Sequence, residues 1–148
     1  MFNEENGIDL LGKLHELAFY GLLATIFCLL RDKITIDILI SNIINYKSFK
    51  SLFIMYLFWS TVLFFPVAII AAYRTKHNND GLTFSSNNII VIIFAHIAEE
   101  LLGLILTPIW TIMYTIKKDW DFYKILDTIL YFIEVIFIII GLYTIFNT

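Results

Sequence analysis

The sequence predicts an all-α integral membrane protein, with four transmembrane helices and one interfacial amphipathic helix in a single membrane domain over residues 1–148. Hydrophobic residues make up 59% of the chain and charged residues 16%, against roughly 45–50% and about 25% in an average soluble domain. The mean hydropathy is +0.82. The apolar residues also gather into runs of about 20, the length that crosses a hydrocarbon core of roughly 30 Å. A soluble globular enzyme is therefore excluded.

Composition excludes several further classes of protein. A net charge of -3 with ten Lys and Arg offers no basic surface for nucleic acid. The single cysteine, Cys28, excludes a disulfide within the chain, a Cys-rich zinc site and a CxxC redox pair. The sequence contains no GxSxG, Walker or HExxH motif, each of which carries a known catalytic chemistry. We expect no enzyme activity, no cofactor and no metal.

The first predicted span covers about residues 10–30. Its charge-free run, residues 17–30, is short for a crossing, so Lys13, His15 and Glu16 must be carried into the span. The stem of Lys13 is long enough for its ammonium group to reach the headgroups. The Glu16 side chain is shorter than that of Lys13, so its carboxyl group reaches the headgroups less easily.

The next segment, about residues 34–48, is too polar to cross but has a helical pattern. Polar residues recur on one side and apolar residues on the other: Asp37, Ser41, Asn45 and Ser48 against Ile36, Ile40, Ile43 and Ile44. This pattern predicts an amphipathic helix. It either lies in the membrane interface beside Lys47 and Lys50, or packs on the end of the bundle.

Three further spans complete the predicted domain. Residues 52–73 carry no charge and contain Pro66, which predicts a kink. Residues 89–116 form a run long enough to require a tilt or a bend at Pro108. The last span is predicted over about residues 125–146.

The distribution of Lys and Arg predicts the orientation. With four crossings and the N-terminus outside, the inner side receives Arg31, Lys33, Lys47, Lys50, Lys117, Lys118 and Lys124. The outer side receives only Lys13, Arg74 and Lys76. We therefore expect both termini on the outer side of a bacterial or mitochondrial inner membrane, unless the segment 34–46 re-enters the bilayer and changes the number of crossings.

The candidate functional residues are ionisable groups inside the spans. A charge at the bilayer centre costs about 2.5–3.5 kcal/mol on insertion scales, so such groups usually face other helices or a watery cavity. They are His15 and Glu16 in the first span, His96, Glu99 and Glu100 in the third, and Glu134 in the fourth. Three spans thus offer His or Glu at overlapping depths.

The depth of these groups follows from their position in each span. Glu134 lies near the middle of its span, so it has no interface within reach. Glu99 and Glu100 lie within about 5 Å of the centre if the third span is residues 89–116. If that span is centred on residues 101–116, they lie at headgroup level instead. Asp127 fits an ordinary position near a helix N-terminus.

Three uses of these residues are open. A carboxyl group in a low-dielectric medium keeps its proton more readily, as proton relays require. His96, Glu99 and Glu100 have a spacing similar to carboxylate–histidine metal motifs, but the matched pairs of a di-iron bundle are missing. The carboxylates could also pair with Lys or Arg of another chain, because this chain has no basic residue in its hydrophobic centre.

The adjacent Glu99 and Glu100 resemble the paired glutamates of intramembrane CAAX-type proteases, whose motif has an arginine four places on. Leu104 stands at that position here, and no histidine follows it in the chain. The expected function is therefore a non-catalytic membrane subunit or binding protein that packs against other membrane helices. The alternatives are a small proton- or cation-coupled transporter or channel acting as a homo-oligomer, and an immunity-type protein against a membrane-inserting toxin.

Overall fold

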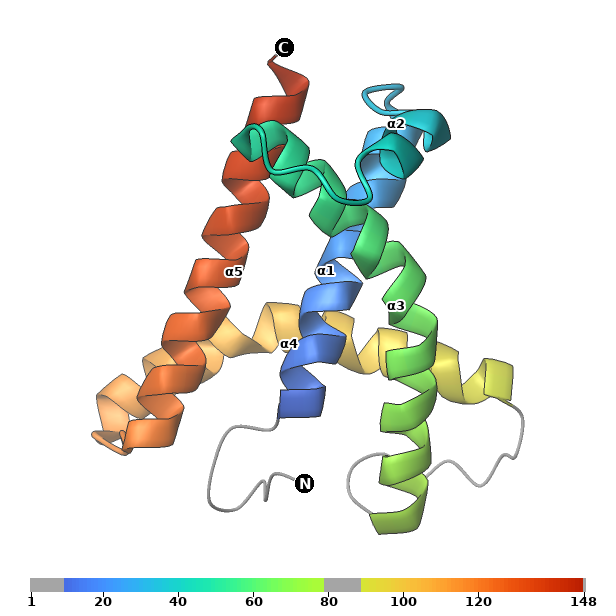
Figure 1. The fold of residues 1–148 in the computed structure, drawn as a ribbon. Helices are drawn as coiled ribbons and strands as arrows, with labels where there is room; N and C mark the ends of the chain where they lie inside the picture. The colour runs from blue at the N-terminus through green and yellow to red at the C-terminus, as the bar shows by residue number, and fades with distance from the viewer. Residues whose placement is uncertain (1–9, 79–88, 148) are drawn as a thin grey trace.

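The computed structural model describes residues 10–78 and 89–147, without the side chains of residues 72, 74–78, 89, 92, 96 and 99. The described residues form helices and turns, with no strand among them. Figure 1 shows the helices α1 (Leu10–Leu30), α2 (Ile36–Ser41), α3 (Phe49–Asn78), α4 (Ile89–Lys117) and α5 (Phe122–Phe146). All except α2 are long and apolar enough to cross a membrane.

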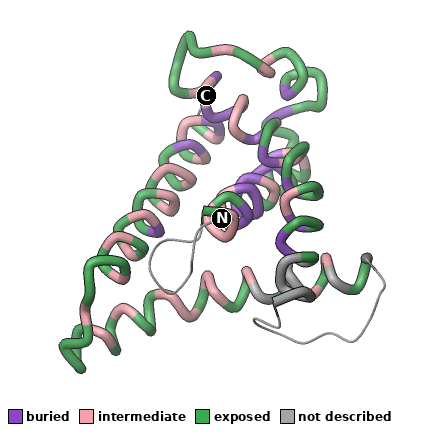
Figure 2. Tube along the Cα trace, turned by 60° about the horizontal axis from the view of Figure 1, so that its bottom comes forward, coloured by how far each residue is buried: buried purple, intermediate pink, exposed green. Residues whose placement is uncertain are grey.

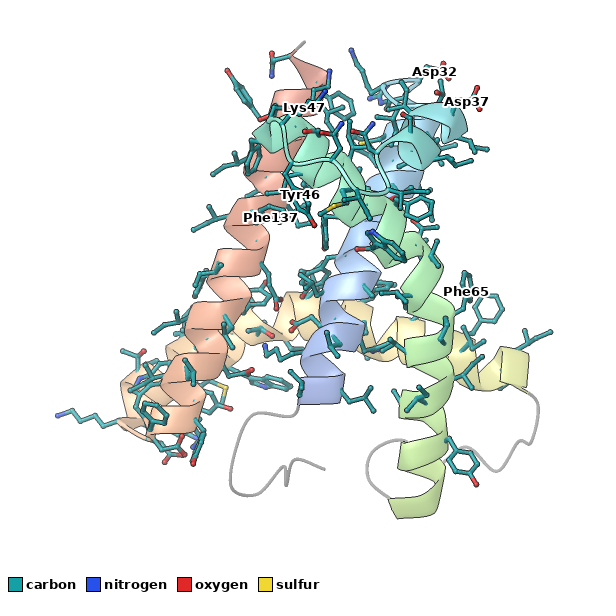
Figure 3. The ribbon with its side chains drawn as sticks, viewed as in Figure 1. Asp32, Asp37, Tyr46, Lys47, Phe65 and Phe137 are labelled. Carbon is teal, nitrogen blue, oxygen red and sulfur yellow. The ribbon has the colours of Figure 1, made fainter. Side chains whose placement is uncertain are left out.

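The helix ends lie close to the predicted ones. α1 has the predicted bounds, whereas α5 begins at Phe122 rather than residue 125. Its earlier start follows from Asp121, whose side chain caps the helix by accepting a 2.7 Å hydrogen bond from the backbone nitrogen of Lys124. α3 contains Pro66 and bends in its middle part (Figure 1), as predicted. Phe65, beside the proline, lies near this bend (Figure 3).

The predicted amphipathic helix over residues 34–48 is wrong in length, because α2 ends at Ser41. Thr35 caps its start by accepting a hydrogen bond from the backbone nitrogen of Ile38. Asn42 stops it, since its side-chain nitrogen donates to the carbonyl oxygen of Ile38, 2.8 Å away. The rest of the segment forms a turn, because Asn side chains compete with the helical backbone for hydrogen bonds.

The core lies mainly between α1 and α3. Figure 2 shows buried residues along α1 and α3 and very few along α5. The two helices approach closely at Gly21, where a Cβ atom would overlap the side chain of Ser60. Two hydrogen bonds join them nearby: the Tyr56 hydroxyl donates to the carbonyl oxygen of Leu17 at 2.6 Å, and the Thr25 hydroxyl to that of Leu57 at 3.2 Å.

α4 lies across the lower part of the molecule instead of alongside the other long helices. Figures 1 and 2 both show it running crosswise to α5 and α3. Consequently α1 and α5 run in the same direction, and the first residue of α1 and the last of α5 lie at opposite ends of the molecule (Figure 1). The predicted sidedness assumes four crossings, whereas α1, α3 and α5 alone would place these two ends on opposite sides. The orientation stays a prediction.

Substitution of Gly21 by alanine tests the close approach of α1 and α3. We expect Gly21→Ala to lower the free energy of unfolding in detergent by about 1–2 kcal/mol, because overpacking outweighs the gain in helix propensity. Gly103→Ala is the matched control, since a Cβ atom there meets nothing within 4 Å. It should be neutral or stabilising by up to about 1 kcal/mol. Equal stability of the two variants would contradict this packing.

Candidate functional site

Charged side chains from α1 and α5 meet at the lower end of the bundle. The Nζ atom of Lys13 lies 2.7 Å from Asp127 Oδ1 on α5 and 3.0 Å from Glu16 Oε2 on its own helix. Lys13 and Glu16 share a face of α1 because they are three residues apart. Both side chains are largely buried, with 17% and 16% of their surface exposed. Lys13 thus ties α5 to α1.

Glu16 has two further neighbours. The Tyr20 hydroxyl, one turn along α1, donates a 3.0 Å hydrogen bond to Glu16 Oε1. The carboxyl of Glu134 on α5 lies near the Glu16 carboxyl. Ionised carboxylates only accept hydrogen bonds, so a bond between two carboxyl groups requires a proton on one of them. The Oε2 atom of Glu134 is buried and has no hydrogen-bond partner within the described part of the chain.

α4 reaches α1 through a second contact. His15 Nδ1 lies 2.7 Å from Glu100 Oε1, and the imidazole ring stacks on Phe64 of α3 with 5.5 Å between ring centroids. The contact is an ion pair when His15 is protonated and Glu100 ionised, and otherwise a hydrogen bond between the ring nitrogen and the carboxyl group. α5 is also joined to α4, because the Tyr131 hydroxyl donates to the carbonyl oxygen of Leu104 at 3.2 Å.

We call seven of the side chains in these contacts the polar cluster: Lys13, His15, Glu16 and Tyr20 of α1, Glu100 of α4, and Asp127 and Glu134 of α5. The structure therefore brings four of the six candidate residues into it. Glu16 and Glu134 form one pair, and His15 and Glu100 form the other. The side chains of His96 and Glu99 lie outside the described residues, although their backbones belong to α4.

Sequence reasoning missed the roles of Lys13 and Asp127. Lys13 and Asp127 form an ion pair, which neither the expected reach of Lys13 to the headgroups nor the position of Asp127 near a helix start indicated. No basic residue was expected in the hydrophobic centre of the chain, but Lys13, near the start of α1, supplies a cation to Glu16. Helical spacing carried a signal: Lys13, Glu16 and Tyr20 share one face of α1, and Asp127, Tyr131 and Glu134 share one face of α5.

The cluster favours two kinds of chemistry. Its hydrogen bonds and ion pairs help to fix the relative positions of α1, α4 and α5. A hydrogen bond between the carboxyl groups of Glu16 and Glu134 would hold a proton. Metal chemistry has no support within the described residues, where no three His, Cys, Asp or Glu side chains are arranged to hold an ion.

Comparison with known proteins gives no relative: no family model, no curated protein and no solved structure matches the chain.

Removal of the Lys13 ammonium tests the cluster. We expect Lys13→Gln to lower the free energy of unfolding by about 1–3 kcal/mol, since Glu16 loses its charged donor in a largely buried position. Lys124→Gln is the control, because its partners Asp119 and Asp121 lie in an exposed turn and exposed ion pairs contribute little. Denaturant titration in detergent measures both variants. A Lys13 variant as stable as the Lys124 variant would contradict the assignment.

Proposed function

We propose that the chain is a non-catalytic integral membrane subunit or binding protein that packs against helices of a larger membrane complex. The polar cluster would hold its own helices in register, and α4 would meet the partner. The observation that carries this proposal is the surface of α4.

α4 is apolar but little covered by the rest of the chain. Among the described side chains of its apolar part, Ile93–Lys117, none is buried. An apolar helix is normally covered by protein or by a bilayer. α4 lies across α1, α3 and α5 (Figure 1). If these three helices span a bilayer, α4 does not run along the same direction through it. Helices of a partner protein would cover it.

The exposed face of α4 has the spacing of a helix-packing seam. Large apolar side chains recur at alternating intervals of three and four residues and are all exposed: Leu102, Ile105, Ile109, Ile112 and Ile116. This is the spacing at which one helix presents side chains to another. The seam supports a helical partner.

The packing of α4 inside the molecule is also incomplete. An apolar groove of about 250 Å³ lies between α1, α4 and α5. Its lining comes from all three helices: Tyr20, Leu23, Ala24, Leu104, Val135, Ile138 and Ile139. A side chain of a partner helix would fill this space, so the groove supports the same proposal.

The first test is the composition of the complex after gentle detergent extraction. We expect other membrane subunits to co-purify at a fixed ratio, and the double variant Ile105→Ala with Ile112→Ala to lower their recovery at least about threefold. The same change at Ile136 and Ile139, which are exposed on α5, is the control. Recovery of the chain alone as a small homo-oligomer would contradict the proposal. The identity of the partner, a machine subunit or a toxin, separates an accessory role from an immunity role.

A second function is favoured by the contact between Glu16 and Glu134. A carboxyl pair that takes up and releases a proton suits a small proton- or cation-coupled transporter acting as a homo-oligomer. In that function, Glu134→Gln abolishes proton flux in liposomes while assembly survives. In a helix-pairing role, the same variant reduces assembly and there is no flux to lose.

Infrared spectroscopy of the full chain tests the shared proton itself. We expect a carboxylic-acid C=O band in the wild type near neutral pH, shifted in heavy water and lost in Glu134→Gln, because a glutamine amide carries no acidic proton. Asp119→Asn, which changes an exposed carboxylate in the turn before α5, is the control and should keep the band. A wild type without such a band would contradict a proton between Glu16 and Glu134.

A further inference from the structure

Residues 31–50 connect α1 to α3 at the upper end of the molecule and have a defined shape. Ile34 and Leu39 are buried against the core formed by α1 and α3. The indole nitrogen of Trp59 on α3 donates a 2.9 Å hydrogen bond to the carbonyl oxygen of Ile43. The segment is thus attached to the helices at three places, and most of its other side chains are exposed.

The outward side of this segment carries large apolar side chains. Ile36 is 65% exposed and Ile44 is 73% exposed, and Ile40 and Tyr46 are exposed as well. The three isoleucines belong to the apolar side of the predicted amphipathic pattern, so the burial of Ile34 and Leu39 does not use that side. Clustered exposed apolar side chains of this size mark a surface for a partner or a membrane.

Basic residues surround the apolar ones. Arg31, Lys33, Lys47 and Lys50 belong to the segment, against the acidic Asp32 and Asp37. Figure 3 shows Asp32, Asp37 and Lys47 at the same end of the molecule. The segment is therefore net positive in a chain whose net charge is -3. Its charge is complementary to an anionic surface.

The position of the segment relative to a bilayer indicates which anionic surface it would meet. It joins the end of α1 to the start of α3, so a bilayer crossed by both helices has its headgroups at this level. Basic side chains next to a span attract anionic lipids, and apolar side chains between them reach the acyl boundary. Lys33 and Arg31 already lie over aromatic rings, at 5.5 Å from the Phe146 centroid and 5.9 Å from the Phe27 centroid.

We propose that residues 31–50 form a binding surface for anionic phospholipid headgroups. Arg31, Lys33, Lys47 and Lys50 contact the phosphates, and the exposed isoleucines with Tyr46 enter the upper acyl region. This inference rests on the membrane insertion assumed in the proposed function, but it needs no protein partner.

Hydrogen exchange of the full chain in liposomes tests this surface. We expect the backbone amides of residues 36–46 to exchange about tenfold more slowly in equal phosphatidylcholine and phosphatidylglycerol than in phosphatidylcholine alone. Raising the salt concentration should remove this difference in the wild type, because salt screens exposed charges. The amides in the middle of α3 report insertion separately, since they should exchange slowly in both bilayers.

Two variants separate binding from general charge effects. Replacement of Arg31, Lys33, Lys47 and Lys50 by glutamine should abolish the lipid dependence. Replacement of Lys117, Lys118 and Lys124, which lie around the turn between α4 and α5, should leave it intact. Equal exchange in the two bilayers, or a lipid dependence that survives the fourfold substitution or high salt, overturns the proposal. Fast exchange in the middle of α3 would instead contradict membrane insertion, and with it the proposed function.

Discussion

The arrangement of the helices depends on one constraint: the charged side chains of α1 need hydrogen-bond or ion-pair partners on the other helices. Leaving a charge unpaired in hydrocarbon costs about 2.5–3.5 kcal/mol on insertion scales. Lys13 meets Asp127, Glu16 meets Tyr20 and Glu134, and His15 meets Glu100. Each contact on another helix helps to fix α5 or α4 against α1. Apolar packing adds to these contacts, because Ile145 and Tyr131 of α5 belong to the two core clusters and Phe53 of α3 fills the space beside Gly141.

The close packing of α1 and α3 leaves the other faces of α1 available. At Gly21 the side chain of Ser60 occupies the space of a Cβ atom, so the two helices lie against each other along one face. α5 and α4 then approach from the remaining sides, where the polar cluster forms. Because Lys13 pairs with Glu16 inside the chain, the proposed partner would cover the exposed surface of α4 rather than supply a missing cation.

Sequence patterns predicted the elements better than their arrangement. The bounds of α1 followed from the charged residues after Leu30, and the other long helices from apolar run lengths. The helical pattern over residues 34–48 overran α2, because Asn42 ends the helix with its own side chain. The pairing of Lys13 with Asp127 depends on how α1 and α5 are rotated and placed, which apolar patterning does not encode. The crosswise path of α4 is likewise a tertiary feature that run length cannot reveal.

A double-mutant cycle between Lys13 and Asp127 tests the central claim most directly. Lys13→Met, Asp127→Leu and the double variant are compared with the wild type by the free energy of unfolding in detergent. Because the two side chains are in contact across α1 and α5, we predict a coupling energy of about 1 kcal/mol or more. The effects of substitutions at distant sites are instead additive to within roughly 0.3–0.5 kcal/mol. Additive effects of the two substitutions would contradict the account, because the ion pair that ties α5 to α1 would then be absent.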